Sequence, residues 1–519
     1  MPAAPSAVML HLLFISATVA AASSLHQPNI LFIGTDQQRT STLGCYGNSW
    51  AHSPNIDRLA ADGVRFTDAV TVSPVCSPSR TSVLTGVHVP VHGVYENGVN
   101  RFDNVENLTP YFDVLKKAGY ATALIGKTHF APVPDTIDHL DAHTGNTDMR
   151  GPTTTDGDYL ETYLVNESMK WIDNMTQRGH GRPWYLYTSM VSPHPPNWVP
   201  RGEPWSSIYA NTTLPPLNYR GDDIARLPYQ TRLLLGLLGK EEDDPPAFPK
   251  GDRCAGATKP VAHCTVPNMS YIDAPVGHGL ASPDGRYNYY ALAAYVDHEV
   301  GRLLDFLDRR GLRNGTLVVF ASDHGSMLFD HGIGNDKHNF LDASLRIPLI
   351  MRFPGVLPAG ATRAFATTLD ITTTLVTAAA GPDAVPRGYQ GFDLVGPISQ
   401  GGASPRMVGV SCEYRAMAVV TPRWKLAYFP EQHEGRLFDR RSDPFEQNDL
   451  YGNASVVHVK QGLLLALLRW RAQQDPIAFL NAHLPPHPTA PTAKIVVNHT
   501  RGIRGVDAEL RLQEDALKF

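Results

Sequence analysis

The sequence predicts an α/β protein: a large mixed, mostly parallel sheet covered by helices, followed by a smaller antiparallel α+β subdomain. Two observations predict this class. Short apolar runs alternate with helical patterns over residues 29–353, and closely spaced short strands take over after about residue 400. A length of 519 residues suits one large domain with an appendage, or two to three domains.

The expected strands are short apolar runs, and helical patterns lie between them. The strands are Asn29–Thr35, Tyr120–Ile125, Trp184–Ser189, Leu317–Ser322 and Pro348–Phe353, and the helices are Asn55–Asp62, Thr109–Ala118 and Tyr287–Arg310. Strands that alternate with helices favour a largely parallel sheet with both faces covered. In such sheets, ligands bind beyond the carboxyl ends of the strands.

The chain divides into four parts. We expect a leader at residues 1–22 and a catalytic domain at residues 27–400. The catalytic domain contains an irregular insertion at 196–286 that is rich in Pro, Gly, Trp and Tyr. An antiparallel subdomain at 401–480 and a Pro-rich connector and tail at 481–519 follow. In the antiparallel subdomain we expect strands Met407–Cys412, Ala416–Val420, Lys425–Phe429 and Arg436–Phe438, then a helix Val456–Gln473.

The net charge argues against a nucleic-acid partner, and the N-terminal residues indicate how the protein is targeted. A net charge of −5 gives no basic field for nucleic acid. The apolar run Ala7–Ala22 ends in small residues, which predicts a signal peptide cleaved near Ala22. A retained membrane anchor is the alternative, but the run is shorter than the ~20 residues that a spanning helix needs. No later segment is apolar enough to give a stable membrane span.

Sequons and cysteines also bear on the compartment. Candidate glycosylation sites are Asn166, Asn174, Asn211, Asn268, Asn314, Asn453 and Asn498, whereas Pro110 argues against a further sequon at Asn107. With the leader, they predict a glycoprotein of a eukaryotic secretory pathway, extracellular or lysosomal. Cys254 and Cys264 could close a small disulfide, and the remaining three of the five cysteines leave an odd thiol.

Acidic residues directly follow two of the expected strands. Asp36 follows the first strand, and Asp323 with His324 follows Leu317–Ser322. Taken alone, such an aspartate also fits a helix cap or a turn. Two carboxylates and an imidazole at one sheet edge would suit a divalent cation.

The stretch PVCSPSRTSVLTG, Pro74 to Gly86, carries a cysteine whose role is open. Cys76 could be a buried small hydrophobe, half of a disulfide, a metal ligand or a reactive centre. Pro74 and Pro78 bracket it in a loop that leads into a helix expected at Thr81–Leu84. A thiol at a helix N-terminus favours an anion site or a reactive centre, and Arg80 would face the same point.

The run CSPSRTSVLTG resembles the C-x-P-x-R signature, with its trailing T-G, of the type I sulfatases. These are formylglycine-dependent enzymes of the alkaline phosphatase superfamily, arylsulfatase-like and choline-sulfatase-like. Further matching motifs follow in the family's order from Asn29 to Leu450. They are Asp36 in GTDQQRT, Lys127 and His129 in GKTHF, His194 in SPHPP, Asp323 and His324 in SDHG, Lys337 in KHNFLDASLRIP, and LFDRRSDPFEQNDL near Asp449.

The resemblance implies an alkaline-phosphatase-like fold and a role for each of these residues. Cys76 would be oxidised to formylglycine by the formylglycine-generating enzyme, and the hydrated aldehyde would attack a sulfate ester. Expected ligands of one divalent metal are Asp36, Gln37, Cys76, Asp323 and His324. Expected catalytic residues are Cys76, Arg80, Lys127, His129, His194 and Lys337. The cations would neutralise the sulfate, His194 would protonate the leaving oxygen, and His129 would hold the nucleophile or help release sulfate.

Two positions depart from the arylsulfatase pattern. Gln37 stands where many arylsulfatases have a second aspartate, and His324 stands where they often have asparagine. This pattern is closer to the choline-sulfatase and phosphonate monoester hydrolase branches. Ca²⁺ is the first expectation by resemblance, but the imidazole also admits Mn²⁺ or Mg²⁺.

The expected function is hydrolysis of sulfate monoesters to an alcohol and inorganic sulfate. The sulfate-ester substrate could be a sulfated glycan, with Trp198 and Trp205 in the wall of its pocket. One alternative is a phosphate or phosphonate monoester hydrolase on the same fold. Another is a secreted glycan-binding glycoprotein without catalysis, although the nucleophile and the cations are all present.

Overall fold

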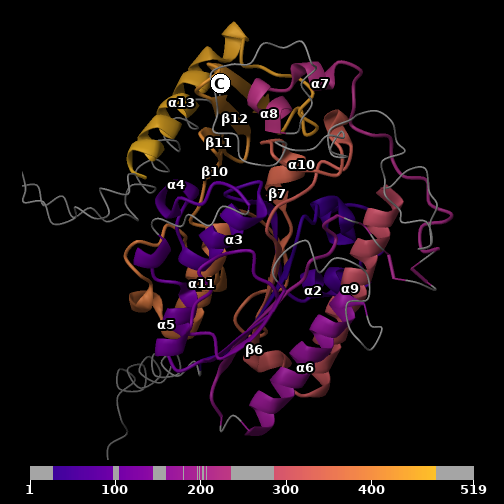
Figure 1. Ribbon diagram of the computed structural model, residues 1–519, viewed down its shortest axis with the longest axis vertical. Coiled ribbons are helices and arrows are strands. Elements are labelled where there is room, and N and C mark those ends of the chain that lie inside the picture. The colour runs from indigo at the N-terminus through magenta and orange to yellow at the C-terminus, as the bar shows by residue number, and fades with distance from the viewer. Residues whose placement is uncertain are drawn as a thin grey trace, which may run out of the picture.

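The computed structural model describes residues 27–97, 105–143, 159–178, 181–195, 197, 199–200, 204–205, 207–234 and 286–474. A nine-stranded sheet forms the centre of this part, and helices cover both of its faces (Figure 1). A second, four-stranded sheet lies toward the end that carries α13 (Val457–Ala472). The predicted α/β class and the smaller C-terminal antiparallel sheet are confirmed.

The large sheet is mixed and mostly parallel. Its parallel half has the order β4 (His139–His143), β3 (Ala121–Lys127), β5 (Trp184–Ser189), β1 (Asn29–Thr35), β6 (Thr316–Ser322). Beyond β6, β8 (Leu349–Arg352) runs antiparallel to both β6 and β2 (Val64–Val70). Strand β2 also pairs antiparallel with β7 (Arg346–Ile347) and parallel with β9 (Gly360–Thr367).

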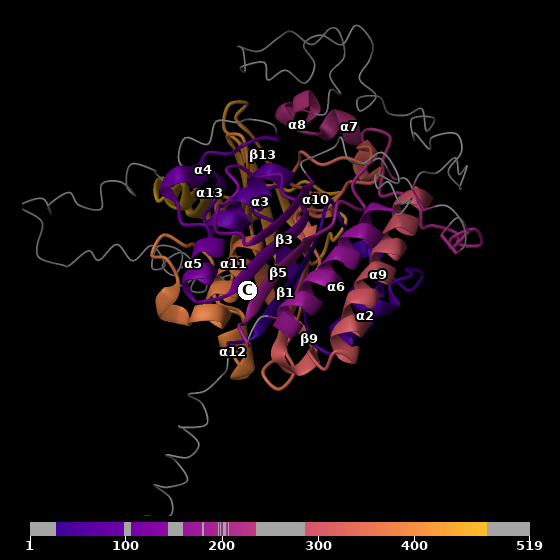
Figure 2. The ribbon, with the colours of Figure 1, turned by 60° about the horizontal axis from the view of Figure 1, so that its bottom comes forward.

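Two helical layers enclose the sheet (Figure 2). On one face lie α3 (Cys76–Thr85), α5 (Tyr111–Lys117) and α11 (Thr368–Ala380), and on the other α2 (Pro54–Ala61), α6 (Leu160–Arg178) and α9 (Arg286–Arg309). Alternate residues of β1 feed two separate cores: Ile30 and Phe32 face the first layer, and Leu31 and Ile33 the second. Burial on both faces explains why these strands are apolar throughout.

The sequence located most of these elements closely. Strands β1 and β5 have the expected bounds, and β3, β6 and β8 differ from theirs by one or two residues. The expected helix Thr81–Leu84 is the C-terminal part of α3, which begins at Cys76 itself. The thiol therefore belongs to the first turn of the helix.

Other elements were not anticipated from the sequence. Strand β9, GATRAFAT, is built mostly of small and polar residues, so it lacks an apolar run. Helix α11 is rich in β-branched threonine, which lowers helix propensity, and it is supported by a capping box between Thr367 and Asp370 and by burial. Helix α6 does have a helical spacing of apolar residues, so it could have been predicted from the sequence, although it was not.

The C-terminal sheet is formed by β10 (Gly409–Glu413), β11 (Ala416–Val420), β12 (Trp424–Phe429) and β13 (Glu434–Asp439), all antiparallel neighbours. Helix α13 packs on one face through Leu463, Leu467 and Trp470. The other face packs on the large domain through Phe340 and Phe365. In the part of the chain that the structure describes, no helix is both long and apolar enough to cross a membrane.

Of the insertion, residues 207–234 are described, with short helices α7 (Asp223–Arg226) and α8 (Tyr229–Leu234). The ring of Trp205, expected in a pocket wall, packs against Tyr295 and His298 of α9, with centroids 5.2 and 5.3 Å away. The expected leader, the Cys254–Cys264 pair, Trp198, Asn268, Asn498 and the tail lie outside the described residues.

Candidate active site

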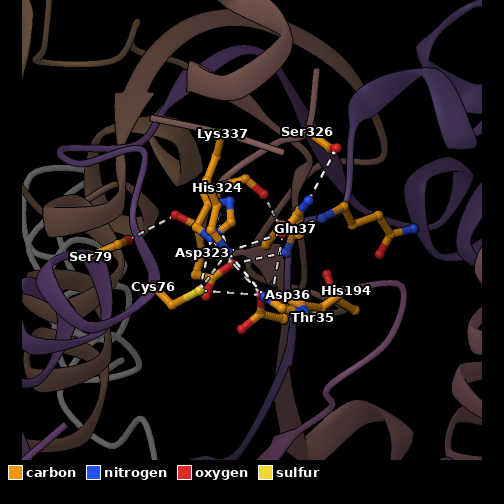
Figure 3. Close-up of polar contacts among 12 residues, drawn as sticks. Thr35, Asp36, Gln37, Cys76, Ser79, His194, Asp323, His324, Ser326 and Lys337 are labelled. Carbon is orange, nitrogen blue, oxygen red and sulfur yellow. Dashed lines mark hydrogen bonds and ion pairs between the residues drawn. The ribbon is translucent and has the colours of Figure 1, made fainter. Parts of the chain in front are cut away.

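The residues singled out in the sequence meet at the carboxyl edge of the parallel strands. Asp36 follows β1, and Asp323 and His324 follow β6. Lys127 ends β3, the second neighbour of β1 in the same parallel set. Figure 3 shows side chains from the ends of β1 and β6 converging with Cys76, His194 and Lys337. Parallel strands bring their carboxyl ends to one edge, and this is why residues far apart in sequence share one site.

Helix α3 presents Cys76 to the site from its first turn. Pro78 is tolerated there because first-turn amides have no partner within the helix. The amide of Ser77 instead donates to Asn97 Oδ1 at 2.8 Å. Ser79 Oγ donates to the carbonyl of Asp323 at 2.8 Å, which fastens the helix to the end of β6. The position of the thiol is thus fixed from both sides.

The Cys76 sulfur is buried among polar groups. Sγ lies 3.1 Å from His324 Nε2, 3.2 Å from Lys337 Nζ and 3.5 Å from Asp36 Oδ1. Burial raises the pKa of the thiol, but Lys337, Lys127 and His324 outweigh burial and hold that pKa well below its ordinary value. This environment stabilises negative charge at the side chain of residue 76.

Arg80 joins the two aspartates from the next turn of α3. Its Nη2 lies 3.0 Å from Asp36 Oδ2, and its Nε lies 2.8 Å from Asp323 Oδ2. Burial and Cys76 oppose ionisation of Asp36, yet the positive charges of Lys127 and Arg80 outweigh them and lower its pKa. Burial and the proximity of Asp36 raise the pKa of Asp323. The two neighbouring carboxyl groups therefore differ in pKa, as expected when two acids share one site.

Strand β3 and the residues after it supply Lys127 and His129. Lys127 is fully buried, and its Nζ lies 2.8 Å from Asp36 Oδ2. His129 has a left-handed backbone (φ 50°), and its side chain helps to lower the pKa of Cys76. A non-glycine residue at positive φ costs of order 1–3 kcal/mol, a strain typical of functional sites. Both side chains therefore lie close enough to Cys76 to lower the pKa of its thiol.

Lys337 and His194 form a pair on another side of Cys76. Lys337 Nζ lies 3.0 Å from His194 Nε2 and donates to Gln37 Oε1 at 3.0 Å. His194 Nδ1 lies 2.6 Å from the Pro195 carbonyl, so Nδ1 carries the proton and Nε2 accepts from Lys337. Burial, together with Lys337, lowers the pKa of His194. The imidazole is therefore neutral in this arrangement.

Four buried side chains offer a metal site. The ligand atoms of Asp36, Cys76, Asp323 and His324 all lie within 4.8 Å of one another. His324 Nδ1 is 2.8 Å from the Gly325 carbonyl, which leaves Nε2 directed at the cluster. Two carboxylates, an imidazole and a thiol form a donor set that fits a divalent cation.

Gln37 borders this cluster through both its backbone and its side chain. Its amide donates to Asp323 Oδ1 at 3.1 Å, and its Oε1 accepts from Lys337. Its backbone is left-handed, with φ 62°. The ligand role expected for Gln37 remains a prediction.

Supporting residues were not singled out from the sequence. Ser189 ends β5 and accepts from Arg80 Nη1 at 2.8 Å. It could have been predicted from its position at the carboxyl end of a parallel strand. Ser326 and Asn335 accept from Gln37 Nε2, at 3.2 Å from Ser326 Oγ and 3.3 Å from Asn335 Oδ1, and no motif marks them. Glu161 in α6 accepts from the Ser192 amide at 2.9 Å, near His194, and this contact depends on tertiary packing alone.

Sequence comparisons agree with this geometry. A family model described as Sulfatase matches residues 28–381, and one described as N-sulphoglucosamine sulphohydrolase, C-terminal, matches residues 330–473. The chain is 26% identical over 504 residues to an N-acetylglucosamine-6-O-sulfatase of Bacteroides thetaiotaomicron, covering 86% of this chain and 87% of that relative. It is 29% identical over 471 residues to a choline-sulfatase of Rhizobium meliloti, covering 82% and 83%.

Solved structures share the fold. One, determined in complex with its substrate D-glucosamine-2-N,6-O-disulfate, has a TM-score of 0.68 at 24% identity and covers 86% of this chain and 98% of its own. Another, the phosphonate monoester hydrolase of Agrobacterium radiobacter, has a TM-score of 0.64 at 23% identity, with coverages of 86% and 96%. These likenesses show that the chain shares the fold of these two structures.

Proposed function

This chain belongs to the sulfatase family and is a sulfate-ester hydrolase, and we propose that it works through a formylglycine derived from Cys76 beside one divalent metal ion. The observation that carries the proposal is that Lys127 and Lys337 both act on the buried side chain of residue 76 and hold its pKa low. The overall reaction adds water to a sulfate monoester and gives an alcohol and inorganic sulfate.

A divalent cation and formylglycine would each supply one kind of chemistry. A cation held by Asp36, Asp323, His324 and an oxygen of residue 76, with Gln37 beside them, would draw electron density from the sulfate. Ca²⁺ is the first choice for this ion, and Mn²⁺ or Mg²⁺ are alternatives. Formylglycine would provide a hydroxyl nucleophile and a second hydroxyl that lets sulfate depart by elimination.

The chain's own residues supply charge and orientation. Lys127, at the end of β3, and Lys337 both act electrostatically on residue 76, so a sulfate next to it would meet two cations. Such preorganised charge is worth on the order of 10²–10³ in rate per group. Arg80 is bound by both aspartates, so its main task is to hold Asp36 and Asp323 in place.

His194 is the proposed acid for the departing oxygen. Because the imidazole is neutral and accepts from Lys337, the proton that it delivers would have to come through that contact. We therefore assign leaving-group protonation to the Lys337–His194 pair. His129, at its strained position, would orient the nucleophile.

We propose a sulfated glycan as the substrate class. The relative named an N-acetylglucosamine-6-O-sulfatase and the C-terminal match to a model named for N-sulphoglucosamine sulphohydrolase support this choice. Choline sulfate is the competitor, because a choline-sulfatase is similarly related. Initial rates with glucosamine-6-sulfate, a sulfated disaccharide and choline sulfate separate the two, and a clear preference for choline sulfate would reject the glycan.

A phosphate or phosphonate monoester hydrolase is the second candidate. Gln37 and His324 in the metal motifs and the fold shared with a phosphonate monoester hydrolase favour it. The test compares kcat/KM for phenyl sulfate, phenyl phosphate and phenyl phenylphosphonate, before and after chelation and after return of Ca²⁺ or Mn²⁺. We expect the sulfate to be preferred and the activity to depend on the metal. Preference for either phosphorus ester would overturn the main proposal.

We also propose that the protein is secreted or lysosomal and glycosylated. Asn174, Asn211, Asn314 and Asn453 are exposed, whereas Asn166 is half-buried in α6 and accepts from Arg302 at 2.6 Å. Among the described sequons, Asn166 is therefore the least suited to carry a glycan. Glycopeptide mapping of protein from a eukaryotic secretory host tests this, together with the N-terminus expected after cleavage near Ala22.

A further inference from the structure

The turn between β10 and β11 touches the segment that carries Lys337. Strand β10 ends at Glu413, and Glu413 Oε1 lies 2.6 Å from Nδ1 of His338, the residue after Lys337. His338 is 8% exposed and Glu413 2% exposed, so the contact is shielded from water. Buried hydrogen bonds of this kind cost more to break than exposed ones, since the abandoned group stays unsatisfied.

The backbone at His338 separates two neighbouring side chains. Its left-handed conformation (φ 67°) lets Lys337 reach Cys76 while the imidazole of His338 reaches the C-terminal sheet. A non-glycine residue holds this conformation only where surrounding contacts compensate for the strain. Glu413 is the side chain that the structure places against His338 for this purpose. The amide of Lys337 is further tied to Asp336 Oδ1 at 2.8 Å.

The same turn reaches the other half of the active site. The hydroxyl of Tyr414, which follows Glu413 and has φ 51°, donates to Glu96. The residue after Glu96 is Asn97, whose Oδ1 accepts from the amide of Ser77 beside Cys76. One two-residue stretch of the C-terminal sheet therefore contacts a neighbour of Lys337 and a neighbour of the residue that caps α3.

We propose that the β10–β11 turn is a positioning element, in which Glu413 acts through His338 to hold Lys337 against residue 76. Tyr414 acts in parallel through Glu96 on the start of α3. The inference deepens the proposed function and rests on it, because it concerns the placement of a cation that meets the sulfate. It also gives the C-terminal sheet a part in the reaction without any contact to the reacting atoms.

The physical reason is the length of the lysine side chain. A buried lysine loses rotamer freedom when its Nζ is held in one place, so a segment free to shift would let Nζ leave the site. A displacement of about 1 Å at a catalytic group can cost on the order of 10²-fold in rate. Substrate binding elsewhere in the pocket would be little affected, so the loss should fall on kcat.

The test is a double-mutant cycle with an aryl sulfate. We expect Glu413→Ala to lower kcat about 10- to 100-fold with KM changed less than about threefold, and Glu413→Gln, which keeps the acceptor, to restore most of it. In a Lys337→Ala background, Glu413→Ala should cost less than about twofold more, because the lysine that it positions is gone. Arg415→Ala, at the exposed tip of the same turn, is the matched control and should stay within about twofold of wild type.

Different results would overturn the inference. Additive losses in the Lys337→Ala background would mean that Glu413 acts independently of Lys337. A raised KM with unchanged kcat would mean that Glu413 contacts the substrate. If Glu413→Ala does not fold, His338→Ala takes its place in the cycle with the same expectations.

A structural readout separates this inference from the proposed function. Crystal structures of wild type and Glu413→Ala should show Lys337 Nζ displaced from the side chain of residue 76, whether or not sulfate esters are turned over. An unmoved Lys337 would reject the positioning role alone. An inactive wild type with formylglycine and metal present would reject the proposed function alone.

Discussion

The segment from Asn335 to Leu345 carries one member of each of two charge clusters, of which the first is buried and the second is partly buried. The active-site cluster comprises Asp36, Cys76, Arg80, Lys127, Asp323 and Lys337. The C-terminal cluster comprises Asp68, Asp342, Lys425, Arg440 and Glu446. In the second, Arg440 Nη2 lies 2.7 Å from Asp68 and 3.1 Å from Asp342, and Lys425 pairs with both Asp342 and Glu446. Each of its cations is enclosed by carboxylates.

The active-site cluster is balanced differently. Its three cations face two carboxylates, and the remaining negative charge belongs to the thiolate of Cys76. Conversion of Cys76 to a neutral aldehyde would leave positive charge uncompensated, and a metal ion would add more. A buried charge without a partner is costly, so such a site favours an anion. Similar charged residues are therefore expected to stabilise the fold where they are matched and to bind an anionic substrate where they are not.

The largest effect should follow from removal of the nucleophile. We expect Cys76→Ala to lower kcat for an aryl sulfate by on the order of 10⁴–10⁶, as for other enzymes that lose a covalent nucleophile. Cys45→Ala, at a half-buried thiol outside the site, is the control and should keep near wild-type activity. Comparable activity in both variants would end the claim that residue 76 carries the reaction.

The next largest effect concerns the leaving group. We expect His194→Ala to lower kcat by about 10²–10⁴ for an alkyl or sugar sulfate, whose alkoxide departs poorly without a proton. The loss should shrink for 4-nitrophenyl sulfate, because nitrophenolate leaves without help. The slope of log kcat against leaving-group pKa is the measurement. An equal loss across the series would contradict the assignment of His194 as the acid.

In the C-terminal cluster, the expected effect is on stability. Replacing fully buried Lys425 by methionine leaves Asp342 and Glu446 without their shared cation, and breaking such a pair costs about 3–5 kcal/mol. Urea unfolding measures this loss, and Lys460→Met, on α13 outside the cluster, is the control. Under folding conditions kcat should change little. A large fall in kcat with unchanged stability would erase the distinction between the two clusters.

The smallest effect is a pH dependence of stability. Burial and Asp342 raise the pKa of Glu446 to about 7, although Lys425 opposes the shift. The folded state then binds a proton that the unfolded state has released. This stability is fully present below about pH 4.5 and is lost as pH rises through about 7, by up to about 3 kcal/mol. Glu446→Gln should flatten the profile of unfolding free energy between pH 5 and pH 8, and an unchanged slope would contradict the shift.

Local sequence patterns were sufficient to predict the parallel strands of the core and the polar residues at the carboxyl ends of those strands. Apolar runs located β1 and β5, and polar residues at strand ends located Asp36 and Asp323. The elements that were missed depend on distant partners: β9 pairs with β2 despite its small residues, and α11 is stabilised by burial between α3 and α5. Likewise, nothing near Lys337 in the sequence points to Glu413, 75 positions beyond His338.

The proposed mechanism depends most on the chemical form that residue 76 takes in the cell. The decisive measurement is mass spectrometry of the peptide that spans Cys76, from protein made in a host that modifies other sulfatases. We expect a side chain in which an aldehyde replaces the thiol, and a mass shift when the peptide reacts with a hydrazine. An unmodified thiol in active protein would contradict the proposed nucleophile.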